Sequence, residues 1–204
     1  MIAIVDYGVG NLFSLEQSFK AIGREVTVTA DPEVLRKADK ILLPGVGAFG
    51  DAAEKLRQSG LDRVVTEQAA TGKPLMGICL GMQLLFEEGH EYGIHKGLGL
   101  ISGKVVAMAG VIPENLKIPH MGWNALKFQK ESPLFSYIQE GDCVYFVHSY
   151  YATDCADAVI ATAEYGADLT AAVQKNNVFG CQFHPEKSGA VGLNILRAFA
   201  EMEG

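Results

Sequence analysis

The chain has 204 residues, of which 49% are hydrophobic and 20% are charged, and its formal net charge is −7 at pH 7. A chain of this size and composition builds a sizeable core, which argues against disorder, collagen-like repeats and coiled coils. The acidic balance, without a basic run, argues against nucleic acid and anionic membranes as partners. The longest nearly apolar stretch, residues 75–86, is shorter than the ~18 residues that cross a bilayer, so we expect no membrane span.

The first residues and the cysteines indicate the compartment. Residues 1–6 lack the basic segment of a secretory signal and form a predicted buried strand, so we expect a cytoplasmic protein. Four cysteines are scattered along the chain without a CxxC pair, which argues against a disulfide framework and a structural zinc site. We therefore expect reduced thiols, no metal and no cofactor.

The first part of the chain alternates short apolar runs with segments of helical period. Strands are predicted at residues 2–5, 26–29, 41–43 and 74–78, and helices at 12–22, after Asp31-Pro32, at 48–56, up to about residue 70, and at 80–88. This alternation predicts parallel strands joined by right-handed crossovers, with ligands at the carboxyl ends of the strands.

Beyond the glycine-rich residues 89–103, the pattern changes to strands. They are predicted at residues 100–108, 125–130, 143–152 and 158–165, followed by a hairpin that turns at 175–177 and returns through 178–183. Ser188 is expected to cap a last amphipathic helix. We therefore predict one three-layer α/β domain over residues 1–204, with a mixed, largely parallel central sheet, helices on both faces, and antiparallel strands in the C-terminal half.

The segment Gly77-Ile78-Cys79-Leu80-Gly81 lies where a predicted strand meets a predicted helix. This G-x-C-x-G pattern is the cysteine form of a nucleophile elbow, a sharp turn that leaves room only for glycine beside the exposed nucleophile. The helix N-terminus after the cysteine favours the reactive thiolate. The alternative is a small buried cysteine in a close-packed crossover, and this is what we expect of Cys143, Cys155 and Cys181.

The segment Phe183-His184-Pro185-Glu186 offers a base for such a nucleophile. Pro185 is predicted to keep the segment extended, so that His184 and Glu186 point to one side. His184 can then take the Cys79 proton and return it to a leaving amine, while Glu186 supports the imidazolium. The alternative is an ordinary surface histidine beside a carboxylate. No spacing of acids supports a metal site at His120 or His148.

Residues 44–50 contain a G-x-G-x-x-G sequence directly after a predicted strand. A dinucleotide site needs an acidic residue at the end of the following strand, but that strand ends at Cys79. We predict instead that backbone N–H groups of Gly45, Val46 and Gly47, with that of Leu80, form an oxyanion hole opposite the thiolate. The alternative is a turn whose glycines serve only tight packing.

These motifs resemble the triad, or class I, glutamine amidotransferases. Further segments that are similar to the glutaminase subunits of imidazole glycerol phosphate synthase lie at residues 5–12, 43–49, 81–85, 119–124, 146–150 and 182–188. The Asp-Tyr-Gly sequence at residues 6–8 and the Pro-Gly-Val-Gly sequence at 44–47 are specific to that family. The resemblance covers the chain from end to end.

The resemblance implies that the chain hydrolyses glutamine to glutamate through a Cys79, His184 and Glu186 triad. The ammonia would pass to a separate (β/α)₈-barrel cyclase, with which the chain forms a heterodimer that makes imidazole glycerol phosphate and aminoimidazole carboxamide ribotide in histidine biosynthesis. The resemblance assigns glutamine binding to Gln83, Glu91, Ser149 and Tyr150, and places Asn11, Trp123, Tyr145 and Lys187 at the face toward the cyclase.

Two other functions fit parts of the sequence. One is the glutaminase of a different synthase, such as the one that makes pyridoxal phosphate, against which residues 6–12 and 44–47 argue. The other is a non-catalytic scaffold, which would not need Cys79, His184 and Glu186 together.

For the enzyme, glycines on both sides of Val46 let the intervening peptides rotate, so binding of the cyclase could complete the oxyanion hole by a population shift.

Overall fold

The structure is a computed structural model in which residues 1–202 are described. Its larger sheet has nine strands in the order β2-β1-β3-β4-β13-β12-β11-β8-β9. The first five are parallel neighbours: β2 (Val26–Thr29), β1 (Ile2–Val5), β3 (Lys40–Leu43), β4 (Leu75–Ile78) and β13 (Val178–Cys181). The other four are antiparallel neighbours: β12 (Asp168–Lys175), β11 (Val159–Glu164), β8 (His120–Phe128) and β9 (Cys143–His148).

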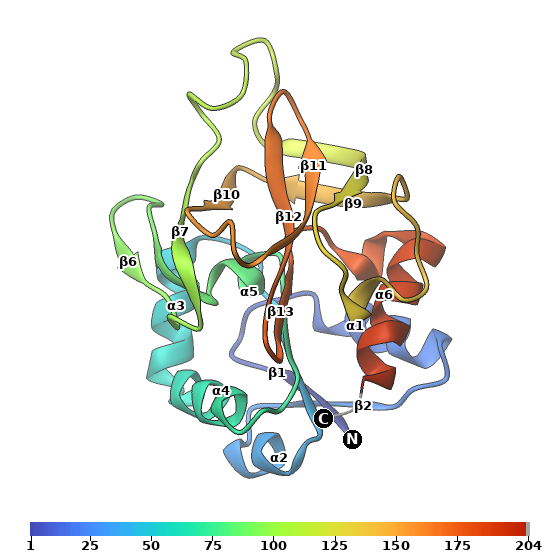
Figure 1. Cartoon of the computed structure of the whole chain (residues 1–204). Coiled ribbons are helices and arrows are strands. Elements are labelled where there is room, and N and C mark those ends of the chain that lie inside the picture. Colours follow the sequence, from blue (N-terminus) through green and yellow to red (C-terminus); the bar gives the residue numbers. More distant parts are fainter. Residues whose placement is uncertain (203–204) are drawn as a thin grey trace.

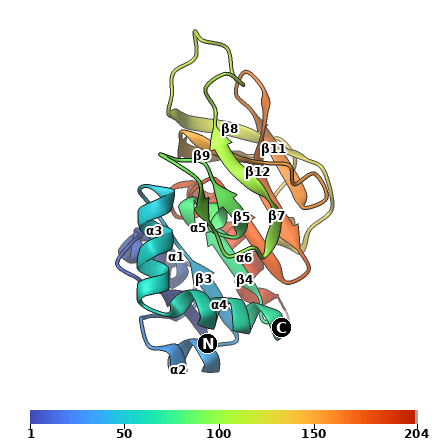
Figure 2. The ribbon, with the colours of Figure 1, turned by 90° about the vertical axis from the view of Figure 1, so that its left-hand side faces the viewer.

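Helices cover both faces of the parallel strands (Figures 1 and 2). On one face, α1 (Leu12–Ala21) and α6 (Gly189–Glu201) bury Phe19 and Phe199 in one hydrophobic cluster. On the other face, α2 (Pro32–Lys37), α3 (Phe49–Gln58) and α4 (Leu61–Ala70) bury aliphatic side chains in a second cluster. The alternation of inward positions along β1 explains why Ala3 and Val5 belong to this second cluster while Ile2 and Ile4 belong to the first. The mixed α/β fold class is confirmed.

A second sheet of four strands was not expected. Its order is β10 (Tyr150–Thr153), β7 (Ile101–Ala107), β5 (Phe86–Gly89) and β6 (His95–Lys96). The predicted strand at residues 143–152 is therefore two strands, β9 and β10, which part at Ser149 and belong to different sheets. The two sheets thus meet at Ser149 and Tyr150.

The predicted helix at residues 80–88 is wrong beyond its first turn. Helix α5 covers only Leu80–Gln83, and Phe86 already pairs with Ile101 in β7. The carbonyls of Leu84 and Leu85 accept hydrogen bonds from the N–H groups of residues 98, 100 and 101. A longer helix would need those carbonyls for its own ladder, so the returning chain ends it.

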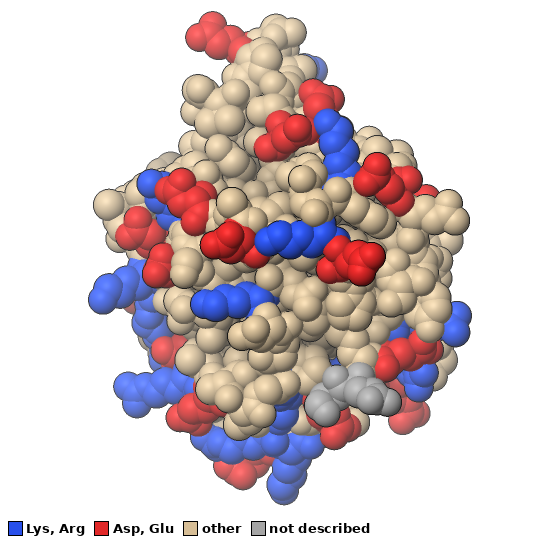
Figure 3. All heavy atoms as spheres, in the orientation of Figure 1, with Lys and Arg blue, Asp and Glu red and all other residues tan. Residues whose placement is uncertain are grey.

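Strand β8 begins at His120, five residues before the predicted start, because residues 120–125 pair with β9. Two single-turn 3₁₀ helices, η1 (Pro133–Phe135) and η2 (Pro185–Lys187), complete the described elements. Among these residues, no helix has the length and apolar character to cross a membrane. Acidic and basic side chains are interspersed over the face seen in Figure 3.

Candidate active site

Cys79 occupies a strained turn between β4 and α5. Its φ angle is 53°, in the left-handed region that residues with a side chain rarely adopt, and its N–H donates to the Cys181 carbonyl at 2.7 Å. A Cβ on Gly77 would lie 2.6 Å from the Gly81 carbonyl oxygen, and one on Gly81 would lie 1.8 Å from the Leu43 carbonyl oxygen. Both glycines are therefore required by close approach of the backbone, as expected for an elbow.

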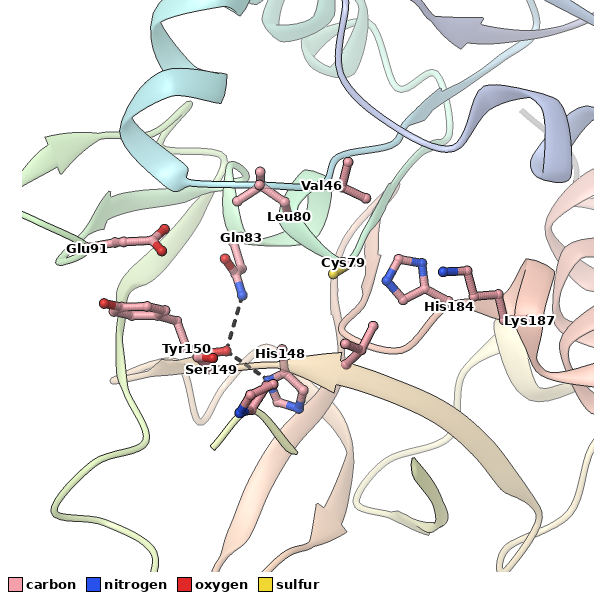
Figure 4. A pocket seen from close by; sticks show the side chains of 13 residues that line it. Val46, Cys79, Leu80, Gln83, Glu91, His148, Ser149, Tyr150, His184 and Lys187 are labelled. Atoms are coloured by element: carbon pink, nitrogen blue, oxygen red, sulfur yellow. Dashed lines mark hydrogen bonds between the residues drawn. The ribbon is translucent and has the colours of Figure 1, made fainter. Parts of the chain in front are cut away.

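His184 lies next to Cys79 (Figure 4), and Glu186 holds the imidazole by a hydrogen bond. Its Nδ1 is 2.8 Å from Glu186 Oε1, and both side chains are buried. Burial alone would lower the pKa of His184, but hydrogen bonds to Cys79 and Glu186 and the charges of those groups raise it to about 9. This arrangement favours a positively charged imidazolium beside the Cys79 sulfur at neutral pH.

The segment from His184 to Glu186 is not extended as predicted. Residues 185–187 form the 3₁₀ turn η2, in which the Lys187 N–H donates to the His184 carbonyl at 3.0 Å. This turn, with Pro185 at its start, brings the two side chains together. Ser188 sits at the N-cap of α6, but its hydroxyl does not cap the helix; it donates to the His184 carbonyl at 2.6 Å and accepts from the Tyr145 N–H at 2.9 Å.

A cavity of about 350 Å³ opens over these groups. Its walls include the turn between β4 and α5, α5 itself, the segment before α3, the junction of β9 and β10, and the segment that contains η2. The lining residues are Val46, Gly47, Cys79, Leu80, Gln83, Glu91, Pro119, Val147, His148, Ser149, Tyr150, His184 and Lys187. All four residues assigned to glutamine binding are among them, so the structure brings together residues that lie far apart in the sequence.

Two of the predicted glutamine-binding residues are anchored by backbone groups. Gln83 Nε2 donates to the Tyr150 carbonyl at 3.2 Å, which joins α5 to β10. Glu91 Oε2 accepts from the Phe49 N–H at 2.7 Å, at the N-terminus of α3. Figure 4 shows the Glu91 carboxylate and the Tyr150 ring on the same side of the cavity as Gln83, at a distance from the Cys79 sulfur. A ligand several atoms long can therefore reach from Glu91 to Cys79.

The predicted oxyanion segment divides into two parts. Val46 and Gly47 line the cavity with Leu80, whereas Gly45 packs behind it. A Cβ on Gly45 would lie 2.8 Å from the Gly81 N and 2.9 Å from the Tyr7 hydroxyl oxygen. Close packing therefore requires a glycine at position 45, whereas Gly47 has a φ of +99° and nothing within 4 Å of an added Cβ, and rotation of the peptides between them stays a prediction.

Tyr7 contacts the predicted oxyanion segment on the side away from the cavity, and no role was assigned to it from the sequence. It is buried, and its hydroxyl donates to the Pro44 carbonyl at 2.8 Å. Burial and the charge of Cys79 raise the pKa of Tyr7, so it stays a neutral donor. Its place in the Asp-Tyr-Gly sequence after β1 is the signal that could have found it, because the ends of β1 and β3 are neighbours.

The four residues predicted to face the cyclase lie on separate elements. Trp123 on β8 is exposed and packs edge-on against Tyr145 on β9, with ring centroids 6.0 Å apart. Asn11 caps α1 by accepting from the Ser14 N–H, and Lys187 lies at the mouth of the cavity beside His184. The Tyr145 carbonyl also accepts from the His184 N–H at 2.9 Å, so strand β9 directly supports the histidine.

His120 and His148 do not gather acids around a metal. His120 Nδ1 is 3.1 Å from His148 Nε2, and the outer nitrogens contact Asn124 Oδ1 and the Tyr150 carbonyl. Burial lowers the pKa of both imidazoles, to about 3 for His148. Among residues 1–202, no group of three or more histidine, cysteine, aspartate or glutamate side chains is placed to hold a metal.

Comparisons with known proteins show the family of the chain. The family model of class-I glutamine amidotransferases matches residues 3–202. The imidazole glycerol phosphate synthase subunit HisH of Sulfurimonas denitrificans is 52% identical over 98% of both chains, and that of Syntrophotalea carbinolica is 48% identical over 99% of this chain and all of its own.

Solved structures share the fold at lower sequence identity. A crystal structure titled as a glutamine amidotransferase superposes with a TM-score of 0.76 at 20% identity, over 98% of both chains. The structure of PurLQS from Thermotoga maritima gives the same TM-score at 21% identity, over 98% of this chain and 96% of that one. The chain therefore belongs to the class-I glutamine amidotransferases and, within them, to the family of HisH subunits of imidazole glycerol phosphate synthase.

Proposed function

We propose that this chain hydrolyses glutamine to glutamate and ammonia with Cys79, His184 and Glu186, and delivers the ammonia to a (β/α)₈-barrel cyclase. The observation that carries the proposal is the Cys79 sulfur at a strained elbow, beside a buried histidine that Glu186 holds by its Nδ1. Full-length similarity to HisH subunits supports the choice of glutamine as substrate and of a cyclase as partner.

In the first half of the reaction, the Cys79 thiolate attacks the side-chain amide carbon of glutamine. A carbon–sulfur bond forms, and the carbonyl oxygen becomes an oxyanion that backbone N–H groups of Val46, Gly47 and Leu80 would bind. His184 then gives its proton to the nitrogen as the carbon–nitrogen bond breaks, and ammonia leaves. Glu186 keeps the imidazole oriented and supports its positive charge throughout.

In the second half, water resolves the γ-glutamyl thioester on Cys79. His184, now neutral, takes a proton from the water while its oxygen attacks the thioester carbon. The carbon–sulfur bond breaks, and the sulfur leaves as the thiolate that the renewed imidazolium stabilises. The new γ-carboxyl group loses its proton to water, glutamate leaves the cavity, and the site returns to its starting protonation state.

The cavity fits the rest of the substrate by charge and hydrogen bonding. Glu91 presents a carboxylate to the substrate ammonium, and Ser149 and Tyr150 lie beside Gln83 on the same wall. The amide nitrogen of Gln83 donates to the Tyr150 carbonyl and to Gln182 Oε1, so the side-chain carbonyl of Gln83 is the group left to face the substrate. The proposal includes a cytoplasmic location, which suits four free cysteines and a biosynthetic partner.

The proposed cyclase face includes Asn11, Trp123, Tyr145 and Lys187. Exposed Trp123 and the neighbouring Tyr145 supply the aromatic contact area that protein interfaces favour. Lys187 stands at the rim of the cavity from which ammonia must leave. A docked cyclase over this rim would receive ammonia without its release to water.

The direct experiment mixes the chain with a barrel cyclase and its ribotide substrate and measures glutamate release. We expect glutamine hydrolysis that rises when the cyclase and its ligand are both present. No hydrolysis under any condition would support the non-catalytic scaffold. Hydrolysis that responds only to the partner of another synthase, such as the one that makes pyridoxal phosphate, would support the other glutaminase.

A further inference from the structure

Gln182 is fully buried, and neither the sequence nor the proposed chemistry gives it a role. It follows Cys181, whose carbonyl accepts from the Cys79 N–H, and it precedes Phe183 and His184. Its Nε2 lies 3.8 Å from the Cys79 sulfur, and its Oε1 lies 3.0 Å from Gln83 Nε2. The side chain therefore touches the nucleophile on one side and a substrate-binding candidate on the other.

The direction of these two amides is fixed by a backbone group. The Tyr150 carbonyl can only accept, so the nitrogen of the Gln83 amide must face it. The two hydrogens of that nitrogen are then used by the Tyr150 carbonyl and by Gln182 Oε1. Gln182 must consequently turn its own nitrogen toward Cys79, since its oxygen is committed to Gln83.

The Tyr150 carbonyl, which orients the Gln83 amide, has no acceptor position left for another donor. The Tyr150 carbonyl also faces His148 Nδ1 at 2.8 Å, so both of its lone pairs have partners. Reversing the Gln182 amide would place its nitrogen against the Gln83 nitrogen and its oxygen against the sulfur. A contact between two donors would replace the Gln83–Gln182 hydrogen bond in a buried place, and the sulfur would lose its N–H donor.

We infer that Gln182 is a positioning residue that keeps an N–H donor on the Cys79 sulfur and turns the Gln83 carbonyl toward the substrate. The donor stabilises the thiolate more than the thiol, because hydrogen bonds to charged acceptors are stronger than those to neutral ones. The same amide holds Gln83 in the one orientation that leaves its carbonyl free. This inference rests on the proposed function for the use of Cys79 as the nucleophile and of Gln83 as a contact of the substrate.

The first test is the pH dependence of Cys79 alkylation by iodoacetamide in the full chain, followed on the Cys79 peptide by mass spectrometry. Gln182→Met keeps the length of the side chain but removes both hydrogen bonds. We expect the midpoint of the pH profile to rise by about one unit and alkylation at neutral pH to slow about tenfold. Gln174→Met is the matched control, because within residues 1–202 the Gln174 side chain bonds only to Ser132 and Asn176, and it should leave the profile unchanged.

The second test measures the KM and kcat of glutamine hydrolysis for the native chain and for Gln182→Met, each in complex with the cyclase. Gln182→Met should raise the KM for glutamine about 3- to 10-fold, since Gln83 loses one of its two anchors, and should also lower kcat. A chain that does not hydrolyse glutamine but still shows the alkylation shift would refute the proposed function and the substrate contact of Gln83, and would leave the Gln182 donor on the Cys79 sulfur standing.

A further measurement needs no change at Gln182. The side-chain amide protons of Gln182, observed by NMR, should shift between the native chain and Cys79→Ala, whereas those of Gln174 should not. An unchanged alkylation midpoint in a folded Gln182→Met chain would overturn the inference. So would Gln182 amide resonances that are indifferent to the loss of the Cys79 sulfur, which decides the matter if Gln182→Met does not fold.

Discussion

Gly81 is the position where one added methyl group should damage both the elbow and the oxyanion segment. A Cβ there would lie 1.8 Å from the Leu43 carbonyl oxygen and 3.1 Å from the Pro44 carbonyl carbon. Contacts of real Cβ atoms are essentially never shorter than 3.0 Å, so the backbone of α5 or of residues 43–44 must move by about 1 Å. Neither can yield easily, since Leu43 and Leu80 are buried.

Gly81→Ala should therefore lose about 1–3 kcal/mol of folding free energy, the usual cost of overpacking a core. For a chain of this length, the melting temperature should fall by roughly 2–12 °C. The displacement lies between Cys79 and the segment that would bind the oxyanion. A misplacement of this size costs a rate on the order of a hundredfold, so glutaminase activity should fall by about that factor even where the chain is folded.

The matched control is Gly72→Ala, at a glycine with a φ of +92° and nothing within 4 Å of the added Cβ. It should cost about 1–2 kcal/mol of backbone strain and leave the rate of glutamine hydrolysis unchanged. Melting curves and glutamate release, measured on both variants, separate the two effects. If Gly81→Ala were as stable and as active as the native chain, the close approach of α5 and β3 would not matter to the site.

Three further predictions concern titration and the oxyanion segment. Because the pKa of His184 is raised to about 9, glutamine hydrolysis should decline as pH rises through about 9, where the proton for the leaving ammonia is lost. The folding stability that this raised pKa of His184 contributes is full below pH 6.5 and should be lost as pH rises through about 9. A pH–rate profile that stays flat to pH 10 would contradict this assignment. Burial lowers the pKa of His148 to about 3, so below pH 6.5 the unfolded chain binds a proton that the folded chain does not. The free energy of unfolding should therefore decrease as the pH is lowered, by about 2 kcal/mol at pH 5, as measured by denaturation. His148→Gln should largely remove this loss. Gly47→Ala should lower the cyclase-stimulated rate about a hundredfold with little effect on the KM for glutamine, because Gly47 has space but a φ of +99°; undiminished stimulation would refute a role for rotation at this position.

Local pattern was sufficient for most of the parallel half of the fold. The strands β1 and β2 and the helices on both faces follow from hydrophobic period and from caps such as Asp31, whose carboxylate accepts from the Glu33 N–H. The second sheet could not be predicted in this way, because Phe86 continues an apolar run that suits a helix. Its strand character comes from pairing with Ile101 and from carbonyls claimed by residues far along the chain.

The candidate site shows the same division. The elbow at Cys79 and the His-Pro-Glu segment carry their own sequence signals, and the structure places both at one cavity. The amide of Gln182 carries no signal of its own, and the hydroxyl of Tyr7 is marked only by its place in the Asp-Tyr-Gly sequence, because each acts through a side-chain contact with a residue distant in the sequence. The close packing of Gly45 against the Gly81 backbone and the Tyr7 hydroxyl could not be predicted from the local sequence, because both neighbours are distant along the chain.

The most direct test of the central claim uses Cys79→Ala in complex with the cyclase. Because the thiolate is needed only to split the amide, this variant should release no glutamate from glutamine, yet should support synthesis by the cyclase at the native rate when ammonia is supplied. Continued release of glutamate by Cys79→Ala would contradict the claim that Cys79, activated by His184 and Glu186, is the nucleophile.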